Sequence, residues 1–232
     1  MTFQSLASSS SGNAYVIRDE ETCILLECGI SYKKILKLVG FHLSEVKACL
    51  ITHEHKDHAK SAGELISRGV TVYMSNGTAE ALEIEGADII GDLGQFTVGS
   101  LDVLPFAVFH DAAEPLGFLI KSRIDGDVLV FATDTVNLRY RFPGLNILAI
   151  EANYDKDVLA RCEKLPDKVR HRIENTHMEI STLCDYLCSL DLSACREIHL
   201  LHLSDSTSRE AEFLAKVRRV VPSGVAVRAC GK

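Results

Sequence analysis

The sequence lacks several features that would assign it to common protein classes. It has no tryptophan, and aromatic residues make up only 6% of its 232 residues, so no aromatic platform for stacking the bases of single-stranded nucleic acid is visible. No apolar run reaches the roughly 18 residues that a membrane-spanning helix needs, so no membrane association is expected. Positive charge is scarce, because 25 Lys and Arg against 32 Asp and Glu give a net charge of −7. This balance disfavours a protein that coats nucleic acid by bulk charge, although an enzyme with a local basic patch is still allowed.

The cysteines and the lack of linkers indicate a reduced protein of one domain. None of the eight Cys forms a Cys-x-x-Cys pair, and several stand in apolar segments, so we predict reduced, mostly buried thiols and a cytoplasmic location. Residues 1–5 show no basic flank followed by an apolar stretch, so no secretory signal is expected. No linker and no repeat divides the sequence, which predicts a single domain over residues 1–232. No stable protein partner can be inferred.

Short apolar runs alternate with helical patterns along the chain. We predict strands over residues 15–18, 23–28, 46–51, 69–74, 95–98, 101–106, 116–122, 128–132, 145–150 and 197–201. We predict helices over residues 32–39, 59–68, 78–85, 155–164, 178–190 and 208–219. Many strands, interspersed helices and a helix-rich end are typical of an α+β fold whose sheets are covered by helices on their outer faces.

The strongest functional signal is the segment Thr52–His58, which stands between a predicted buried strand and a predicted helix. It contains four potential metal ligands: His53, His55, Asp57 and His58. Clustering such side chains is costly unless a cation compensates their burial, and a polar solvated loop is the alternative. Because His53 and His55 are two positions apart on an extended segment, they can point the same way. One loop can therefore supply ligands to two adjacent metal ions.

Three further candidate ligands stand at the ends of apolar runs elsewhere in the chain: His110, Asp134 and His202. A four-coordinate metal site needs ligands from outside one loop, and strand ends that feed one edge of a sheet are a natural place for them to converge. Each of the three, taken alone, would more often be an ordinary core or surface residue. Beside the Thr52–His58 cluster, we predict that they are ligands.

The order of these residues resembles that of the metallo-β-lactamase fold superfamily. The pattern is His53-x-His55-x-Asp57-His58, then the lone His110, then Thr-Asp-Thr around Asp134, then the late His202. The chain is most similar to the small bacterial WalJ/YycJ-like subgroup, whose members are described as DNA exonucleases. Further marks of the subgroup are the segments Ser8–Asn13, Leu25–Gly29, Glu151–Asp155 and His202–Asp205. The resemblance covers about residues 1–210 and implies a four-layer αββα sandwich with a two-metal site at one edge.

The resemblance also implies a ligand set. His53, His55 and His110 would bind the first metal ion, Asp57, His58 and His202 the second, and Asp134 would bridge the two. The chain departs from the family pattern in that Ala7 and Ser9 stand where glycines are usual, Glu27 where Asp is usual, and Met178-Glu179-Ile180 where Leu-Ser-Asn follows the histidine.

Glu27, His177 and Asp57 are candidates for roles beside or beyond metal binding. We expect Glu27 to accept a hydrogen bond that orients a ligand imidazole, an ordinary strand-end carboxylate being the alternative. His177 is a candidate catalytic residue that contacts the substrate or protonates the leaving group, because its usual pKa lies near neutrality. The alternative is a polar residue at the start of a helix. Asp57 is a candidate catalytic residue as well as a ligand.

Two segments are candidates for contact with the substrate. Ser10, Ser11 and Asn13 would line a cleft with hydroxyl and backbone N–H donors for a phosphate, and a tight turn is the alternative. The segment 161–172 is locally basic. Its Arg170 and Arg172 are candidates for contact with a phosphodiester backbone, and a solvated helical face is the alternative.

Taken together, these residues predict a metal-dependent hydrolase with two divalent metal ions, Zn or Mn, that uses a metal-bound hydroxide. The resemblance narrows this prediction to a phosphodiesterase or nuclease of the DNA exonuclease kind, with nucleic acid, DNA in the first place, as its substrate. A small-molecule ester, thioester or lactone hydrolase on the same site is the main alternative, because one fold hosts many functions. A non-catalytic binding module stabilised by metal is disfavoured by the intact ligand set.

Overall fold

The structure is a computed structural model that describes residues 1–40, 42–163 and 165–231. Two compact units are found: residues 1–107 with 112–127 form unit 1, and residues 108–111 with 128–231 form unit 2. Strands of two sheets, together with helices, confirm the predicted α+β class. The last residue of the predicted helix 155–164, Lys164, lies outside the described residues.

Unit 1 is built on a six-stranded sheet whose strands are neighbours in chain order. The first three strands pair antiparallel, whereas β3, β4, β5 and β6 run parallel. The strands are β1 (Thr2–Ala7), β2 (Ala14–Arg18), β3 (Cys23–Leu26), β4 (Val46–Leu50), β5 (Thr71–Met74) and β6 (Asp88–Ile89). Because parallel strands need crossover connections, the carboxyl ends of β3 and β4 lie side by side at the same edge of the sheet.

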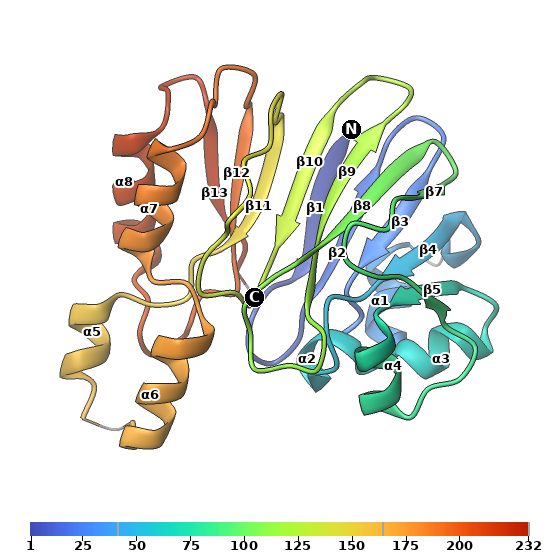
Figure 1. Cartoon of the computed structure of the whole chain (residues 1–232), viewed down its shortest axis with the longest axis horizontal. Coiled ribbons are helices and arrows are strands. Elements are labelled where there is room, and N and C mark those ends of the chain that lie inside the picture. Colours follow the sequence, from blue (N-terminus) through green and yellow to red (C-terminus); the bar gives the residue numbers. More distant parts are fainter. Residues whose placement is uncertain (41, 164, 232) are drawn as a thin grey trace. The chain divides into compact units, whose positions relative to one another are not determined.

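Helices supply these crossovers, and an antiparallel group of strands completes unit 1. The helices are α1 (Tyr32–Leu38), the 3₁₀ turn Leu43–Glu45, α2 (Lys56–Ala59), α3 (Ala62–Ser67) and α4 (Asn76–Leu82). The antiparallel strands are β7 (Phe96–Val98), β8 (Leu101–Ala107) and β9 (Leu116–Ser122). Helix α3 packs against β5 (Figure 1), and the core between helices and sheet includes the fully buried Leu25, Ile51 and Leu65.

Unit 2 contains four parallel strands in the order β10, β11, β12, β13. They are β10 (Val128–Ala132), β11 (Ile147–Glu151), β12 (Glu197–Leu201) and β13 (Ala226–Ala229). The helices are α5 (Lys156–Arg161), α6 (Asp167–Thr176), α7 (Ile180–Cys188) and α8 (Glu210–Val220). Helices α7 and α8 lie side by side, and α8, which precedes β13 in the chain, packs against it (Figure 1). All five residues of β11 are buried, as expected for a parallel strand covered on both faces.

The structure differs from the predicted elements where tertiary contacts outweigh local pattern. The predicted helix 59–68 is divided into α2 and α3, because the Ser61 hydroxyl donates to the Ile30 carbonyl at 2.6 Å and its N–H to the Cys28 carbonyl at 3.0 Å. Helix α6 was not predicted, since its sequence DKVRHRIENT is mostly polar. The strands β1, β6 and β13 were also missed, and β6 is only two residues long.

Two further features of the fold are the state of the cysteines and the lengths of the helices. All eight cysteines are free thiols, and five of them are buried. No helix among the described residues combines the length and the hydrophobicity of a transmembrane span.

Candidate metal centre

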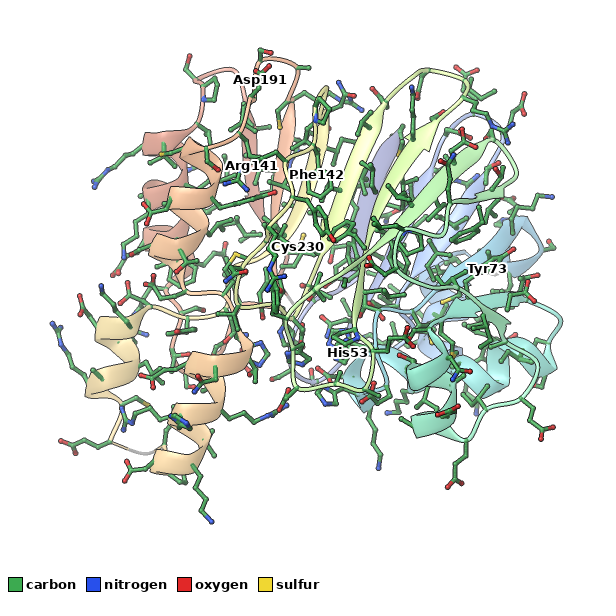
Figure 2. The ribbon with its side chains drawn as sticks, viewed as in Figure 1. His53, Tyr73, Arg141, Phe142, Asp191 and Cys230 are labelled. Atoms are coloured by element: carbon green, nitrogen blue, oxygen red, sulfur yellow. The ribbon has the colours of Figure 1, made fainter. Side chains whose placement is uncertain are left out.

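The predicted metal-binding loop lies at the carboxyl end of β4, where Figure 2 labels His53. Its backbone is held in place by two hydrogen bonds from neighbouring segments. The Asn13 N–H donates to the Asp57 carbonyl and the Cys28 N–H to the His58 carbonyl, both at 2.7 Å. Gly29 lies so close to this loop that a Cβ atom there would stand 1.6 Å from the Asp57 carbonyl oxygen. Only glycine permits this approach, so the loop position depends on Gly29.

The side chains of this loop turn their donor atoms toward one another. His53 Nε2 lies 3.0 Å from His55 Nδ1, and the rings meet edge to face. The ring centroids of His53 and His58 are 4.2 Å apart, and Asp57 Oδ2 is 3.3 Å from His58 Nε2. The Thr52 hydroxyl contacts His53 Nδ1 at 2.8 Å, which leaves His53 Nε2 to face His55. Three imidazoles and a carboxylate are donors suited to Zn or Mn, so the predicted residues are brought together as a metal site requires.

Glu27 lies beneath this loop as a fully buried carboxylate at the end of β3. It accepts the Thr52 N–H at 3.3 Å and lies 3.7 Å from His58 Nδ1. Its φ of 63° is in the left-handed region, which costs a residue other than glycine of order 1 kcal/mol and persists only when neighbours enforce it. Glu27 therefore lies where a group that orients the His58 ring would be expected.

The predicted substrate contacts of unit 1 fall into two environments. Asn13 is fully buried, and its amide nitrogen lies 3.2 Å from the Asp57 carbonyl and 3.1 Å from His58 Nε2. Its amide oxygen accepts hydrogen bonds at 3.1 Å from both the Ser9 N–H and the Tyr15 hydroxyl. Ser10 and Ser11 are exposed. The structure thus places Asn13 under the metal loop and the two serines at the surface.

In unit 2, the carboxyl ends of three parallel strands bring polar side chains together. Asp134 follows β10, Glu151 ends β11, and His202 follows β12. His177 joins them from the junction of α6 and α7. One donor atom of each of these four residues lies within 4.8 Å of the others, and all four side chains are buried. Asp134 and His202 have φ values of 46° and 52°, a backbone strain of the kind that gathers at functional sites.

Glu151 is the centre of this cluster and was assigned no role from the sequence. One carboxylate oxygen lies 2.7 Å from His177 Nδ1 and 3.2 Å from His202 Nδ1. The other accepts the backbone N–H groups of Thr135 at 2.9 Å and Met178 at 3.0 Å. The signal that could have found Glu151 is the one that selected Asp134, a carboxylate at the end of a buried apolar run.

Burial and charge oppose each other in this cluster. Burial acts to raise the pKa of Glu151, but the charge and hydrogen bond of His177 outweigh it, so the pKa of Glu151 is lowered. Burial acts to lower the pKa of His177, but the carboxylate of Glu151 outweighs it, so the pKa of His177 is raised. Both shifts favour the charged forms, in keeping with the 2.7 Å between Glu151 Oε1 and His177 Nδ1.

His110, which belongs to unit 2, is oriented by a backbone carbonyl. Its Nδ1 lies 2.9 Å from the Thr176 carbonyl oxygen, which can only accept a hydrogen bond, so Nδ1 carries the proton. Its Nε2 lies 3.5 Å from Asp134 Oδ2. Burial lowers the pKa of His110 despite the charge of Asp134, and a neutral imidazole with Nε2 available is the form that binds a metal.

The two predicted arginine contacts are engaged with the protein itself. The Arg170 guanidinium donates to the carbonyl of Leu159 and, at 3.1 Å, to that of Cys162. Arg172 pairs with Asp111 through contacts of 2.6 and 3.2 Å. Arg170 therefore stabilises the end of α5, while Arg172 forms an exposed ion pair.

A family comparison agrees with this arrangement. Residues 9–137, more than half of the chain, match the model of the Metallo-beta-lactamase superfamily. The chain belongs to the metallo-β-lactamase superfamily. It is 29% identical over 229 residues to "Exodeoxyribonuclease YycJ" of Bacillus anthracis, covering 90% of this chain and 84% of that one. It is 28% identical over 242 residues to "Exodeoxyribonuclease WalJ" of Streptococcus pneumoniae, covering 96% and 89%.

Solved structures of metallo-β-lactamase type share the fold. The metallo-β-lactamase fold protein YhfI from Bacillus subtilis has a TM-score of 0.75 at 14% identity, covering 99% of this chain and 97% of that one. Zn²⁺-bound PqqB from Methylobacterium extorquens has a TM-score of 0.72 at 14% identity, covering 100% and 99%. The predicted superfamily and fold are confirmed, and the superfamily together with the relatives' names supports the predicted metal-dependent hydrolase.

Proposed function

We propose that this metallo-β-lactamase superfamily protein is a di-metal-dependent phosphodiesterase that hydrolyses nucleic acid, DNA in the first place. The observation that carries the proposal is that the ligand pattern of the superfamily falls on residues gathered into donor clusters in each unit. The substrate class rests on the two relatives named exodeoxyribonucleases, which are similar over most of the chain.

The proposed ligands are the seven residues of the sequence pattern: His53, His55, Asp57, His58, His110, Asp134 and His202. Their imidazole and carboxylate donors suit two divalent ions, Zn or Mn. A single hydrolase domain over residues 1–232 stays a prediction. The cytoplasmic location stays a prediction.

The side chains have distinct tasks in this proposal. Two bound divalent ions would lower the pKa of a coordinated water to about 7 and offset the charge of a phosphoryl group. Asp134 would bind both ions through its carboxylate. Glu151 holds His177 through Nδ1, which leaves His177 Nε2 to give a proton to the leaving oxygen.

The remaining predicted residues act around this chemistry. Asp57 serves as a ligand and a catalytic residue, and Glu27 orients the ring of His58. Ser10 and Ser11 are exposed, so their hydroxyls can meet a phosphate. Asn13 and Arg170 hold the metal loop and the end of α5 by the hydrogen bonds described above, which favours positioning roles for both.

A hydrolysis assay on protein reconstituted separately with Zn and Mn tests the proposal. Its substrates are a 5′-phosphorylated DNA strand, the corresponding RNA, a small phosphodiester, and a panel of thioesters and lactones. We expect cleavage of DNA, and we expect Asp134→Ala to abolish it. Asp191→Ala, which changes an exposed carboxylate of unit 2, is the matched control and should keep full activity.

Two outcomes would overturn parts of the proposal. Turnover of only the thioesters or lactones would keep the two-metal site and reject the nucleic-acid substrate. Normal DNA cleavage by Asp134→Ala would reject the bridging role of that carboxylate, and with it the two-metal mechanism.

A further inference from the structure

A cavity of about 320 Å³ lies in unit 2 where the end of α5 meets the start of α8. Its lining residues are Val158, Arg161, Cys162, Ser206, Arg209 and Glu212. Two guanidinium groups and one carboxylate give this lining a net charge of +1, in a chain whose net charge is −7. The cavity is therefore a local positive site on an acidic protein.

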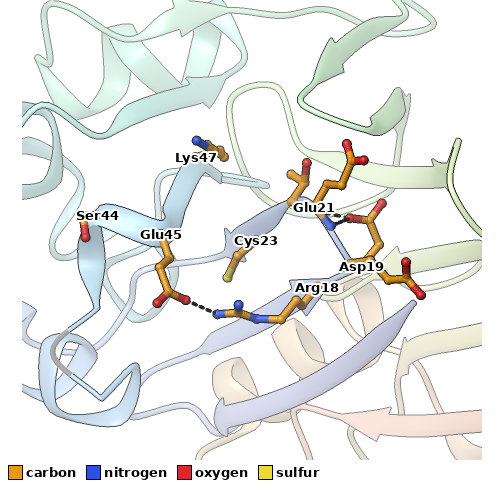
Figure 3. Close-up of a pocket in the computed structure, with 9 residues that line it drawn as sticks. Arg18, Asp19, Glu21, Cys23, Ser44, Glu45 and Lys47 are labelled. Atoms are coloured by element: carbon orange, nitrogen blue, oxygen red, sulfur yellow. Dashed lines mark hydrogen bonds and ion pairs between the residues drawn. The ribbon is translucent and has the colours of Figure 1, made fainter.

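The arginines of this cavity differ from the arginine of a similar cavity in unit 1. That cavity has a volume of about 350 Å³, and in it Arg18 forms an ion pair with Glu45 at 3.0 Å (Figure 3). Its lining contains more carboxylates than cations, so its positive charge is compensated. Among the described residues, by contrast, Arg161 and Arg209 have no ion-pair partner. Their charges remain available to an anion from solution.

The walls of the cavity in unit 2 are held in place by buried or half-buried contacts. Lys216 on α8 pairs with Asp155, the N-cap of α5, at 2.6 Å. Arg170 donates to the Cys162 carbonyl at 3.1 Å, which fixes the end of α5 that carries Arg161. The Thr207 carbonyl accepts the Asp155 N–H at 2.9 Å. The arginines are thus presented by a preorganised frame, which lowers the entropic cost of binding.

The loop that forms one wall of the cavity begins at a proposed metal ligand. His202 and Ser206 are four positions apart, so their Cα atoms are at most about 14 Å apart at the full extension of 3.6 Å per residue. The Ser204 N–H donates to the Asn153 carbonyl at 3.0 Å, which ties this loop to the end of β11. A strand of nucleic acid bound at His202 would therefore pass within reach of the cavity.

We propose that this cavity, the Arg161–Arg209 pocket, binds a phosphate group of the nucleic-acid strand away from the bond that is cleaved. The guanidinium fork matches phosphate oxygens with two parallel hydrogen bonds, and Ser206 adds a hydroxyl donor. The inference rests on the proposed nuclease function for the origin of the phosphate. The pocket itself rests only on the cavity and its two available arginines.

Direct binding by metal-free protein in EDTA tests the pocket independently of turnover. The probe is a fluorescein-labelled single-stranded DNA of 12 nucleotides, followed by anisotropy at several salt concentrations. We expect Arg161→Ala combined with Arg209→Ala to raise the Kd by about tenfold and to reduce the salt slope by about 0.7, the value for one lost phosphate contact on a single strand. Arg219→Ala, an exposed arginine of α8 outside the cavity, is the control and should change neither quantity. An unchanged Kd and slope in the double variant would overturn the proposal.

A gain-of-binding variant excludes a merely structural effect of the arginines. Glu212 is an exposed carboxylate in the lining and opposes an anion, so Glu212→Gln should lower the Kd for the same DNA by about two- to threefold. Unchanged or weaker binding by Glu212→Gln would contradict phosphate binding in the pocket.

Inorganic phosphate and thymidine 5′-monophosphate serve as competitors. If the double variant loses affinity for either small phosphate but keeps the wild-type affinity for DNA, the pocket binds small phosphates and the strand proposal is wrong.

Hydrolysis then separates this inference from the proposed function. With the loaded enzyme, the double variant should raise the KM for the DNA about tenfold and leave turnover of a small phosphodiester unchanged, since a small ester cannot reach the pocket. Suppose that the wild-type protein hydrolyses no phosphodiester and that the double variant binds DNA more weakly than the wild type. In that case the proposed function is wrong, but the pocket is supported. If hydrolysis occurs and both proteins share the same KM, the pocket fails alone.

Discussion

The two units assemble their candidate metal donors in opposite ways. Unit 1 takes its donors from the single segment Thr52–His58, which hydrogen bonds to the backbone of neighbouring residues hold in place. Unit 2 takes its donors from positions spread between His110 and His202, and Glu151 links His202 to His177. A contiguous loop depends on close backbone packing, whereas a dispersed cluster depends on a central charge. We therefore expect unit 1 to be most sensitive to added atoms and unit 2 to a lost carboxylate.

The largest expected effect is the loss of the carboxylate in unit 2. Glu151→Ala removes the acceptor of His177 and of two backbone N–H groups, which should cost about 3–5 kcal/mol of the free energy of unfolding, as for other broken buried pairs. Urea denaturation measures this cost. The control is Glu64→Ala, since Glu64 pairs with Arg68 and both side chains are exposed, so that it should cost about 1 kcal/mol or less. If the two variants lost the same free energy of unfolding, Glu151 would contribute no more to stability than a surface carboxylate does.

The corresponding test of unit 1 adds one methyl group. Gly29→Ala places a Cβ where the Asp57 carbonyl lies, so the metal loop must move, at a cost of about 3 kcal/mol in the range known for overpacking. Thermal unfolding and the metal content of the reconstituted protein measure the effect. Gly63→Ala is the matched control, because nothing lies within 4 Å of a Cβ there, and it should stabilise α3 by up to about 1 kcal/mol. A Gly29→Ala protein with wild-type stability and metal content would show that the loop does not depend on this contact.

A smaller effect is expected at the start of α5. Asp155 accepts the N–H groups of Asp157 and Val158 and pairs with Lys216. Burial acts to raise the pKa of Asp155, but these hydrogen bonds outweigh it, so the pKa is lowered. Asp155→Ala should therefore cost about 1–2 kcal/mol at pH 7, as for other N-cap residues.

The same residue predicts a pH dependence of stability. A carboxyl whose pKa is lower in the folded state stabilises the protein above its unfolded pKa, about 3.8 here, and this stabilisation is lost as the pH falls through the folded pKa. The difference between wild-type and Asp155→Ala proteins in urea should shrink from pH 7 toward pH 3. A constant difference would mean that the charge of Asp155 contributes nothing.

The smallest effect is expected at an exposed pair. Arg172 and Asp111 form a surface salt bridge, with 53% and 39% of their side chains exposed, and such pairs contribute about 0.2–1 kcal/mol. Arg172→Ala should change the free energy of unfolding by no more than about 0.5 kcal/mol. A double-mutant cycle with Asp111→Ala measures the coupling. A coupling energy above about 1.5 kcal/mol would show that this pair stabilises unit 2 more than a surface salt bridge usually does.

The metal donors show how much of the site could be predicted from the sequence. The Thr52–His58 loop was selected because its candidate ligands are neighbours in the chain, and Asp134 and His202 were selected because they follow apolar runs. Glu151 obeys the same strand-end rule, yet nothing local indicates that it bonds His177, which lies 26 positions away. Asn13 was predicted to line a cleft that contacts the substrate, and only the packed loop shows that it is buried against Asp57 and His58.

The sequence by itself determined the superfamily and the α+β class, and it selected the candidate metal donors. These follow from short-range chemistry: the spacing of His and Asp, and the apolar runs that become buried parallel strands. Tertiary structure alone decided which carboxylate holds which imidazole, why residue 29 must be glycine, and which arginines keep an available charge. Those features depend on distances between segments that are remote in the chain, because burial and pairing set the energy of a charge more strongly than residue type does.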